Sequence, residues 1–186
     1  MNFTRQNSTC FGFLETRGLN LIRINKLEEA EKIYTELLSR NPENHLYYQQ
    51  LAISKGANSS EAKLDLYASL SEKYPKAQSP LRLSLDIASG PKFRELVDIY
   101  MKKALRKGIP PLFVDLRPLY EDASKVEILE NLCQDYYANL TKIGKFEPDE
   151  KALKEPATAL LWLLYYMSQH YDHKKDFTKV KYFFLT

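Results

Sequence analysis

The stretch NKLEEAEKIYTELLSRNPEN (residues 25–44) decides the fold class of this chain. Its apolar residues recur at spacings of three, four and three, and they are Leu27, Ala30, Tyr34 and Leu37. Such spacing puts all four side chains on one face of an α-helix. The helix cannot bury this face by itself, so the rest of the sequence must supply a partner.

Two local signals set the expected ends of this helix. Asn25 followed by Glu28 has the pattern of a capping box, which predicts that the helix starts at this point. Pro42 has no backbone N–H and cannot continue a helix, so it predicts the end.

A second apolar stripe predicts a partner helix over about residues 11–23, and it contains Leu14, Gly18 and Leu21. Gly18 on this helix and Ala30 on the next are small, which allows the two backbones to approach closely. Two short antiparallel helices with a small residue on each, a polar turn and a closing proline form the tetratricopeptide pattern.

The pattern recurs at a step of 33 residues, which carries Tyr34 to Tyr67 and Pro42 to Pro75. No segment alternates apolar and polar residues for long enough to predict a strand. We therefore expect an all-α fold, a right-handed α-solenoid of stacked antiparallel helix pairs. Each pair in such a stack buries its apolar face against its neighbours, so the last pair requires a capping partner or a longer parent chain.

The expected domain organisation follows the helix pairs. It comprises a frayed N-terminus (1–10), four tetratricopeptide-like helix pairs (11–141), a polar loop (142–157) and an incomplete fifth pair (158–186).

Composition is that of an ordinary globular protein, with 44% hydrophobic and 27% charged residues. The net charge of +3 is too small to indicate nucleic acid or membrane binding by itself. The N-terminus lacks the apolar run of a signal peptide, and no stretch reaches the roughly 18 apolar residues of a membrane span. We expect a cytoplasmic protein with no membrane partner and with reduced thiols at Cys10 and Cys133.

Residues that usually carry catalysis or bind cofactors are scattered. His170 and His173 lie three apart but lack a further cysteine or histidine nearby, so a metal site is not favoured. Cys133 falls on an apolar stripe, where a buried and inert thiol is expected. The six glycines include no GxG pair, which argues against a phosphate-binding loop. We expect no catalytic residue, no metal, no cofactor and no direct small-molecule substrate.

Two candidate interaction surfaces remain. The first is a basic patch near the end of the helix over residues 91–107, formed by Lys102, Lys103, Arg106 and Lys107. These charges either complement the helix dipole or meet RNA or an acidic partner. The second is a set of side chains that the repeat register places in a concave groove: His45, Tyr48, Trp162, Tyr165 and Gln169. They either anchor a bound chain or pack against neighbouring helices.

Three segments resemble the auxiliary subunit of the N-terminal acetyltransferase A complex. They are LEEAEKIYTELLSRNPENHLYY (27–48), SGPKFRELVDIYMKKALRKGIPPLFVDLRPLYED (89–122) and KEPATALLWLLYYMSQHYD (154–172). The RKGIPPLF turn and the EPATALLW…QHYD segment are the most specific, because no general repeat rule requires them. The likeness extends over about residues 13–180, and members of that family are several times longer.

This resemblance implies a non-catalytic scaffold. Its repeats would curl around a small catalytic acetyltransferase subunit and help to anchor the pair at the ribosome. The alternative is a stand-alone tetratricopeptide adaptor that captures a peptide in its concave groove.

Overall fold

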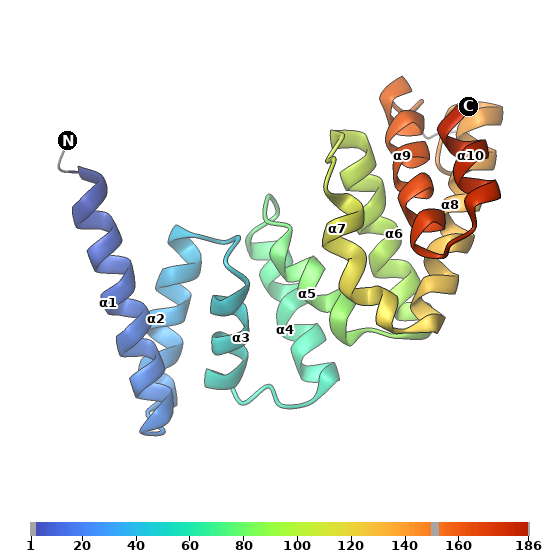
Figure 1. The fold of residues 1–186 in the computed structure, drawn as a ribbon. Helices are drawn as coiled ribbons and strands as arrows, with labels where there is room; N and C mark the ends of the chain where they lie inside the picture. Colours follow the sequence, from blue (N-terminus) through green and yellow to red (C-terminus); the bar gives the residue numbers. More distant parts are fainter. Residues whose placement is uncertain (1–2, 150–152, 186) are drawn as a thin grey trace. The chain divides into compact units, whose positions relative to one another are not determined.

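The computed structural model describes residues 3–149 and 153–185, with side chains from 11 to 149 and from 153 to 183. Every regular element in these residues is a helix (Figure 1), which confirms the all-α prediction. In chain order the elements are α1 (Phe3–Arg23), α2 (Leu27–Arg40), α3 (His45–Ser54), α4 (Ser60–Lys73), α5 (Ser79–Ile87), α6 (Gly90–Lys107), α7 (Leu112–Leu116), the 3₁₀ helix η1 (Arg117–Glu121), α8 (Ala123–Ile143), α9 (Ala157–His173) and α10 (Phe177–Leu185). None of the described helices combines the length and apolar character that a membrane crossing requires.

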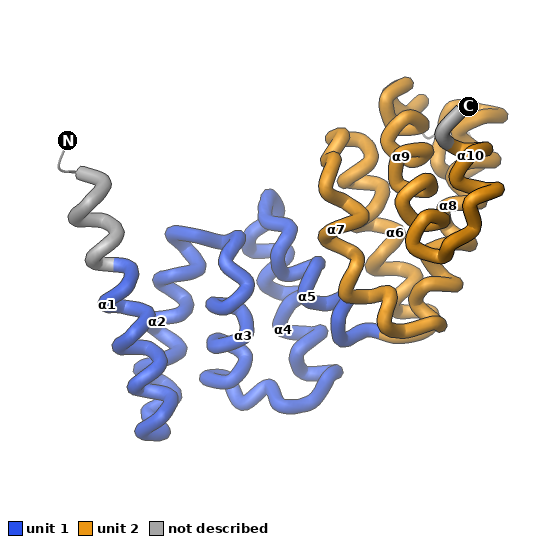
Figure 2. The backbone as a smooth tube through the Cα atoms, in the orientation of Figure 1, with its two compact units in different colours: residues 1–88 blue, residues 89–186 orange. Residues whose placement is uncertain are grey.

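The chain divides into two compact units, residues 1–88 and residues 89–186 (Figure 2). In the first unit α2 packs against both α1 and α3, and α5 packs against α4. In the second unit α6, α8 and α9 pack against one another, and α10 packs against α9. The boundary between the units falls between α5 and α6.

Three of the four stripe residues on α2 are buried as the spacing predicts, and Leu27 is half-buried. Ala30, Tyr34 and Leu37 are fully buried in the core of the first unit. Gly18 on α1 leaves room for the Tyr34 ring, because a Cβ at Gly18 would lie 2.9 Å from Tyr34 Cζ. The small residue on α1 therefore accommodates an aromatic ring of α2.

The turn between α1 and α2 differs from the expected capping box. Asn25 has a φ of +60°, and its N–H donates to the Ile22 carbonyl at 3.0 Å. The Lys26 N–H donates to the Leu21 carbonyl at 2.8 Å, which completes a Schellman motif. Asn25 therefore terminates α1, and the prediction that it caps α2 was wrong. Asparagine suits the position because it tolerates the left-handed region better than most residues.

Helix α1 starts at Phe3, upstream of the expected start at residue 11. The intervening sequence FTRQNSTC contains no proline or glycine to interrupt a helix. The segment expected to fray (1–10) falls on residues whose side chains lie outside the described part of the chain.

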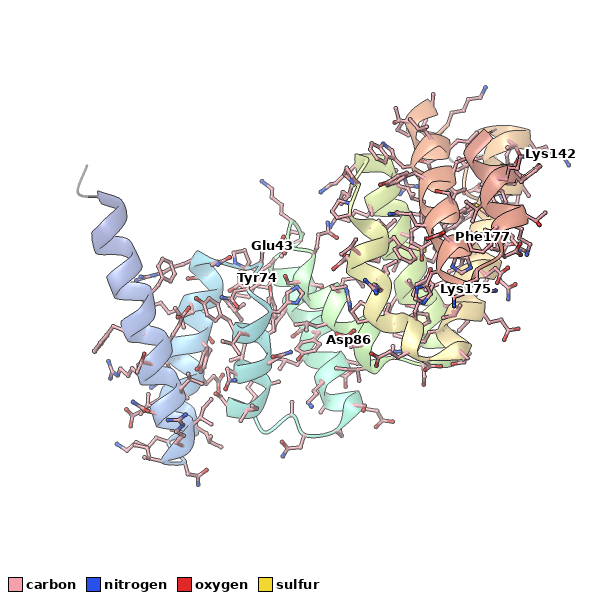
Figure 3. All side chains as sticks on the ribbon, in the orientation of Figure 1. Glu43, Tyr74, Asp86, Lys142, Lys175 and Phe177 are labelled. Atoms are coloured by element: carbon pink, nitrogen blue, oxygen red, sulfur yellow. The ribbon has the colours of Figure 1, made fainter. Side chains whose placement is uncertain are left out.

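Helix α5 is capped by a residue distant in sequence. Glu43, which follows α2, lies beside the start of α5 (Figure 3). Its carboxylate accepts hydrogen bonds from the backbone N–H groups of Gln78 at 3.0 Å and Ser79 at 3.1 Å. These are two of the donors that a helix start leaves without intrahelical partners, and a carboxylate there also complements the helix dipole. Glu43 thereby ties the α2–α3 turn to α5.

Between α8 and α9, residues 144–149 and 153–156 contain no regular element, close to the expected loop. Gly144 ends α8 with a φ of +70°, a conformation that favours glycine. After α6 the chain forms two short elements in succession, α7 and η1. Pro118, at the second position of η1, explains the interruption because it removes a backbone donor.

Candidate partner-binding surface

The turn after α6 packs directly against α9. Gly108 ends α6 with a φ of +64°, and a Cβ there would lie only 2.4 Å from Trp162 Nε1. The Ile109 N–H donates to the Ala104 carbonyl at 3.2 Å and closes the turn. The RKGIPPLF turn and the EPATALLW segment are therefore in contact, which gives a physical reason for two motifs that no repeat rule requires.

Helix α9 presents apolar and aromatic side chains to solvent beside this turn. Leu161 is 60% exposed, and Tyr165, one helical turn further on, is 44% exposed. Trp162 is half-buried, and its ring meets the Tyr165 ring edge-on at a centroid distance of 6.2 Å. We call Leu161, Trp162 and Tyr165 the α9 face. The Gly108 turn packs against Trp162, whereas the side chains of Leu161 and Tyr165 remain accessible to a partner.

Gln169 continues along α9 but is half-buried. Its Oε1 is buried and has no hydrogen-bond partner among the described residues. The carbonyl oxygen of Gln169 is therefore not accessible to a partner in this conformation.

His45 and Tyr48, the two expected groove residues that lie on α3, are in different environments. His45 is exposed at the start of the helix. Tyr48 is fully buried, packs edge-on against Tyr67 at 6.3 Å and donates its hydroxyl proton to the Pro42 carbonyl at 2.7 Å. The prediction that Tyr48 faces a groove was wrong, because α3 buries two adjacent tyrosines instead of a narrow stripe. Sequence reasoning also missed the exposed Leu46 and Ile53 on the same helix.

Acidic side chains of this protein pair with Lys102 and Arg106 of the basic patch. Lys102 is buried and contacts Asp98 at 2.7 Å and Glu147 of the following loop. The Lys102 ammonium also lies 5.7 Å from the centre of the Tyr136 ring. The prediction that Lys102 is part of a surface patch was therefore wrong, because it joins α6 to the loop after α8.

Arg106 makes a similar link to the same loop. Its guanidinium bonds both oxygens of Glu155 in a bidentate pair, at 2.7 Å and 2.6 Å. Hydrogen bonding to Glu155 raises the pKa of Arg106. Lys103 is half-buried and Lys107 is exposed in the last turn of α6. The acidic residues of the loop were the overlooked signal in the sequence.

A buried polar cluster joins η1, α8 and α9. His170 Nδ1 lies 2.6 Å from the Tyr120 hydroxyl, which is also 2.9 Å from the Tyr166 hydroxyl. Burial lowers the pKa of His170 to about 4, so this imidazole is neutral near pH 7. The His173 ring instead packs edge-on against Tyr120 at 5.1 Å. The two histidines therefore make different structural contacts.

Burial and hydrogen bonding also shift the pKa values of Glu130 and Cys133 on α8. Burial opposes ionisation of Glu130, but hydrogen bonds from Lys174 and Tyr171 hold its pKa down to about 2. Burial raises the pKa of the Cys133 thiol, which suppresses the thiolate form. Within residues 3–149 and 153–185, no three histidine, cysteine or acidic residues are grouped so as to hold a metal ion. Cys10 lies outside the described side chains.

Successive helices that pack against their neighbours are typical of the class of helical-repeat proteins. Residues 3–183 match the family model described as "N-terminal acetyltransferase A, auxiliary subunit", and the chain belongs to this family. The resemblance inferred from the three sequence segments is thereby confirmed.

Several relatives document the similarity. The chain is 41% identical over 158 residues to mouse "N-alpha-acetyltransferase 16, NatA auxiliary subunit" and 39% identical to its human counterpart. It is 36% identical over 166 residues to "N-terminal acetyltransferase A complex auxiliary subunit NAA15" of Arabidopsis thaliana. These alignments cover 84–85% of this chain and 18% of each relative, so the chain spans about a fifth of their length.

A solved structure described as "Structure of Naa15/Naa10 bound to HypK-THB" contains a chain with the same fold. The TM-score is 0.70 and the sequence identity 32%, over 85% of this chain and 22% of that chain.

Proposed function

We propose that this chain is a non-catalytic scaffold segment of an N-terminal acetyltransferase complex and binds a catalytic subunit. The observation that carries the proposal is the family match over residues 3–183. The shared fold adds support, since the description of the solved relative names Naa15 together with Naa10. A chain of helix pairs suits this role because it offers extended surface for binding.

The chemistry of the described residues supports a binding role. The buried Cys133 thiol has a raised pKa and is a poor nucleophile. His170 is buried against Tyr120 and Tyr166 and has no accessible position from which to exchange a proton with a substrate. The burial of Cys133 and His170 is explained by packing within the second unit.

The α9 face is the surface that we assign to the catalytic subunit. Leu161 and Tyr165 are accessible, whereas Trp162 is held by the Gly108 turn and gives the face a rigid base. Aromatic and aliphatic side chains on a rigid support dominate binding energy at protein interfaces. Covering each of these half-exposed side chains contributes about 1 kcal/mol to binding.

Titration of the chain with a purified catalytic acetyltransferase subunit tests the proposal. We expect Tyr165→Ala to weaken binding about fivefold, which corresponds to about 1 kcal/mol, and Leu161→Asp to weaken it about tenfold or more because it also brings a charge into the interface, while circular dichroism remains unchanged. Ile24→Asp is the matched control, because Ile24 is 63% exposed and lies on the first unit. No binding by the unmodified chain would overturn the scaffold proposal, and full binding by both α9 variants would overturn the assignment of the face.

We extend the proposal to ribosome contact through the end of α6, which places the protein in the cytoplasm. Lys107 is exposed there, and the neighbouring Lys103 is half-buried. Lysines at such a site gain affinity for phosphates by releasing counterions, so binding falls as salt is added. We expect Lys107→Glu to lower co-sedimentation with ribosomes, whereas Lys76→Glu on the first unit does not. Equal sedimentation of both variants would refute ribosome contact at this helix end.

A further inference from the structure

A groove follows α6 on the side that meets α8 and the loop after it. It consists of two adjoining cavities of about 520 and 410 Å³, which share Asp98, Ile99, Lys102, Phe146 and Glu147 as lining residues. The lining positions on α6 run from Pro91 to Arg106 at helical spacing, which corresponds to about 22 Å of groove. We call it the α6–α8 groove, and both cavities fall within the size range of sites that bind ligands.

An aliphatic side chain is accessible in this groove. Ile99 is 49% exposed and lines both cavities. The buried Leu132 and Phe146 also line the wider cavity, and Phe146 is fixed by an edge-on contact with Tyr136 at 4.9 Å. The groove therefore offers one accessible aliphatic side chain, Ile99, beside the buried Leu132 and Phe146.

Acidic groups outnumber cations around the wider cavity. Its lining contains four carboxylates, Glu95, Asp98, Asp135 and Glu147, and two cations, Arg94 and Lys102. The buried Lys102 is held by Asp98 and Glu147, so these charges belong to the wall itself.

The other two carboxylates of the wider cavity, Glu95 and Asp135, form ion pairs that are exposed to solvent. Asp135 pairs with Arg94 at 3.0 Å, and Glu95 pairs with Lys92 at 2.9 Å. In each of these pairs both side chains are at least 46% exposed. Exposed ion pairs contribute little to stability, so Glu95 and Asp135 can exchange their present partners for cations of a bound chain.

We propose that the α6–α8 groove binds a short segment of a partner protein in which one aliphatic side chain is flanked by lysine or arginine. The aliphatic side chain packs on Ile99, and the flanking cations face Glu95 and Asp135. The excess of carboxylates around the wider cavity selects a basic segment over an acidic one, whereas the second cavity is lined by three carboxylates and three cations and contributes no net charge. This site shares no residue with the α9 face, so it takes a second partner independently of the catalytic subunit.

A pair of synthetic peptides provides the test. One carries a leucine flanked on each side by two lysines within an alanine–glycine backbone, and the other carries glutamates in place of the lysines. Each is titrated into the isotopically labelled full chain and followed by NMR. We expect the basic peptide to shift the Ile99 methyl signals and to show contacts between its leucine and Ile99, with binding that weakens as salt is added. The acidic peptide should bind at least tenfold more weakly.

Variants separate the apolar and electrostatic contributions. Ile99→Asp and the double change Glu95→Lys with Asp135→Lys should each lower affinity for the basic peptide at least tenfold. Val114→Asp alters another exposed aliphatic residue of the second unit outside the groove and should leave binding unchanged. Circular dichroism of each variant verifies the fold.

The proposal is overturned if the basic peptide causes no shift at Ile99 up to millimolar concentration. It is equally overturned if the acidic peptide binds as well as the basic one, or if the double charge reversal leaves affinity unchanged.

Discussion

The contact between Gly108 and Trp162 makes Gly108→Ala the most informative single substitution. Gly108 meets two demands at once, a φ of +64° that favours glycine and the absence of a Cβ against the indole ring. Alanine would be strained in the left-handed region, and its Cβ would lie 2.4 Å from Trp162 Nε1. Either the ring or the turn must move.

The magnitude follows from adding these two effects. The left-handed conformation costs an alanine about 1–2 kcal/mol relative to glycine. Overpacking against a ring that cannot retract freely costs about 1–3 kcal/mol. We therefore expect the free energy of unfolding to fall by about 2–5 kcal/mol.

Gly144→Ala is the matched control for the backbone contribution. Gly144 also ends a helix of the second unit, with a φ of +70°, but the nearest atom to its Cβ position is Lys154 Cδ at 3.9 Å. Only the conformational cost of about 1–2 kcal/mol should appear there. Urea unfolding measures both variants, and the fluorescence of the one tryptophan in the chain reports on the contact itself.

A double-mutant cycle isolates the steric contribution. Trp162→Phe removes the indole nitrogen, so Gly108→Ala should cost less in that background, with a coupling free energy of about 1 kcal/mol or more. If Gly108→Ala costs no more than Gly144→Ala and shows no coupling to residue 162, the two specific sequence segments are not held together as described.

Three further predictions concern other parts of the chain. The pKa of His170 is lowered from 6.5 to about 4, so the unfolded state binds the proton more tightly than the folded state. The free energy of unfolding should therefore fall by up to about 3 kcal/mol as the pH drops from 6.5 to 4. In urea titrations, His170→Gln should flatten this dependence on pH. Glu43→Ala should lower the free energy of unfolding by about 1–2 kcal/mol through loss of the α5 cap, whereas Glu36→Ala, at an exposed pair, should change it by less than about 0.5 kcal/mol; equal effects would argue against the cap. In a Cys10→Ser chain, Cys133 should react with a thiol reagent only as urea unfolds the protein, and rapid labelling of the folded chain would contradict its burial.

The sequence by itself determined the helical class and the core of α2. Spacings of three and four residues require one helical face, and Ala30, Tyr34 and Leu37 are buried as that spacing predicts. The resemblance of three segments also sufficed to identify the family. These features depend on residues close together in the chain, and local periodicity records them directly.

Only the tertiary structure decided the roles of residues whose partners lie far along the chain. Lys102 is buried because Glu147 approaches from the loop after α8, and α5 is capped by Glu43 from a turn in another part of the first unit. Tyr48 is buried because Tyr67 of α4 packs against its ring. The period of a helix fixes which residues share a face, but whether that face meets solvent depends on which distant elements pack against it.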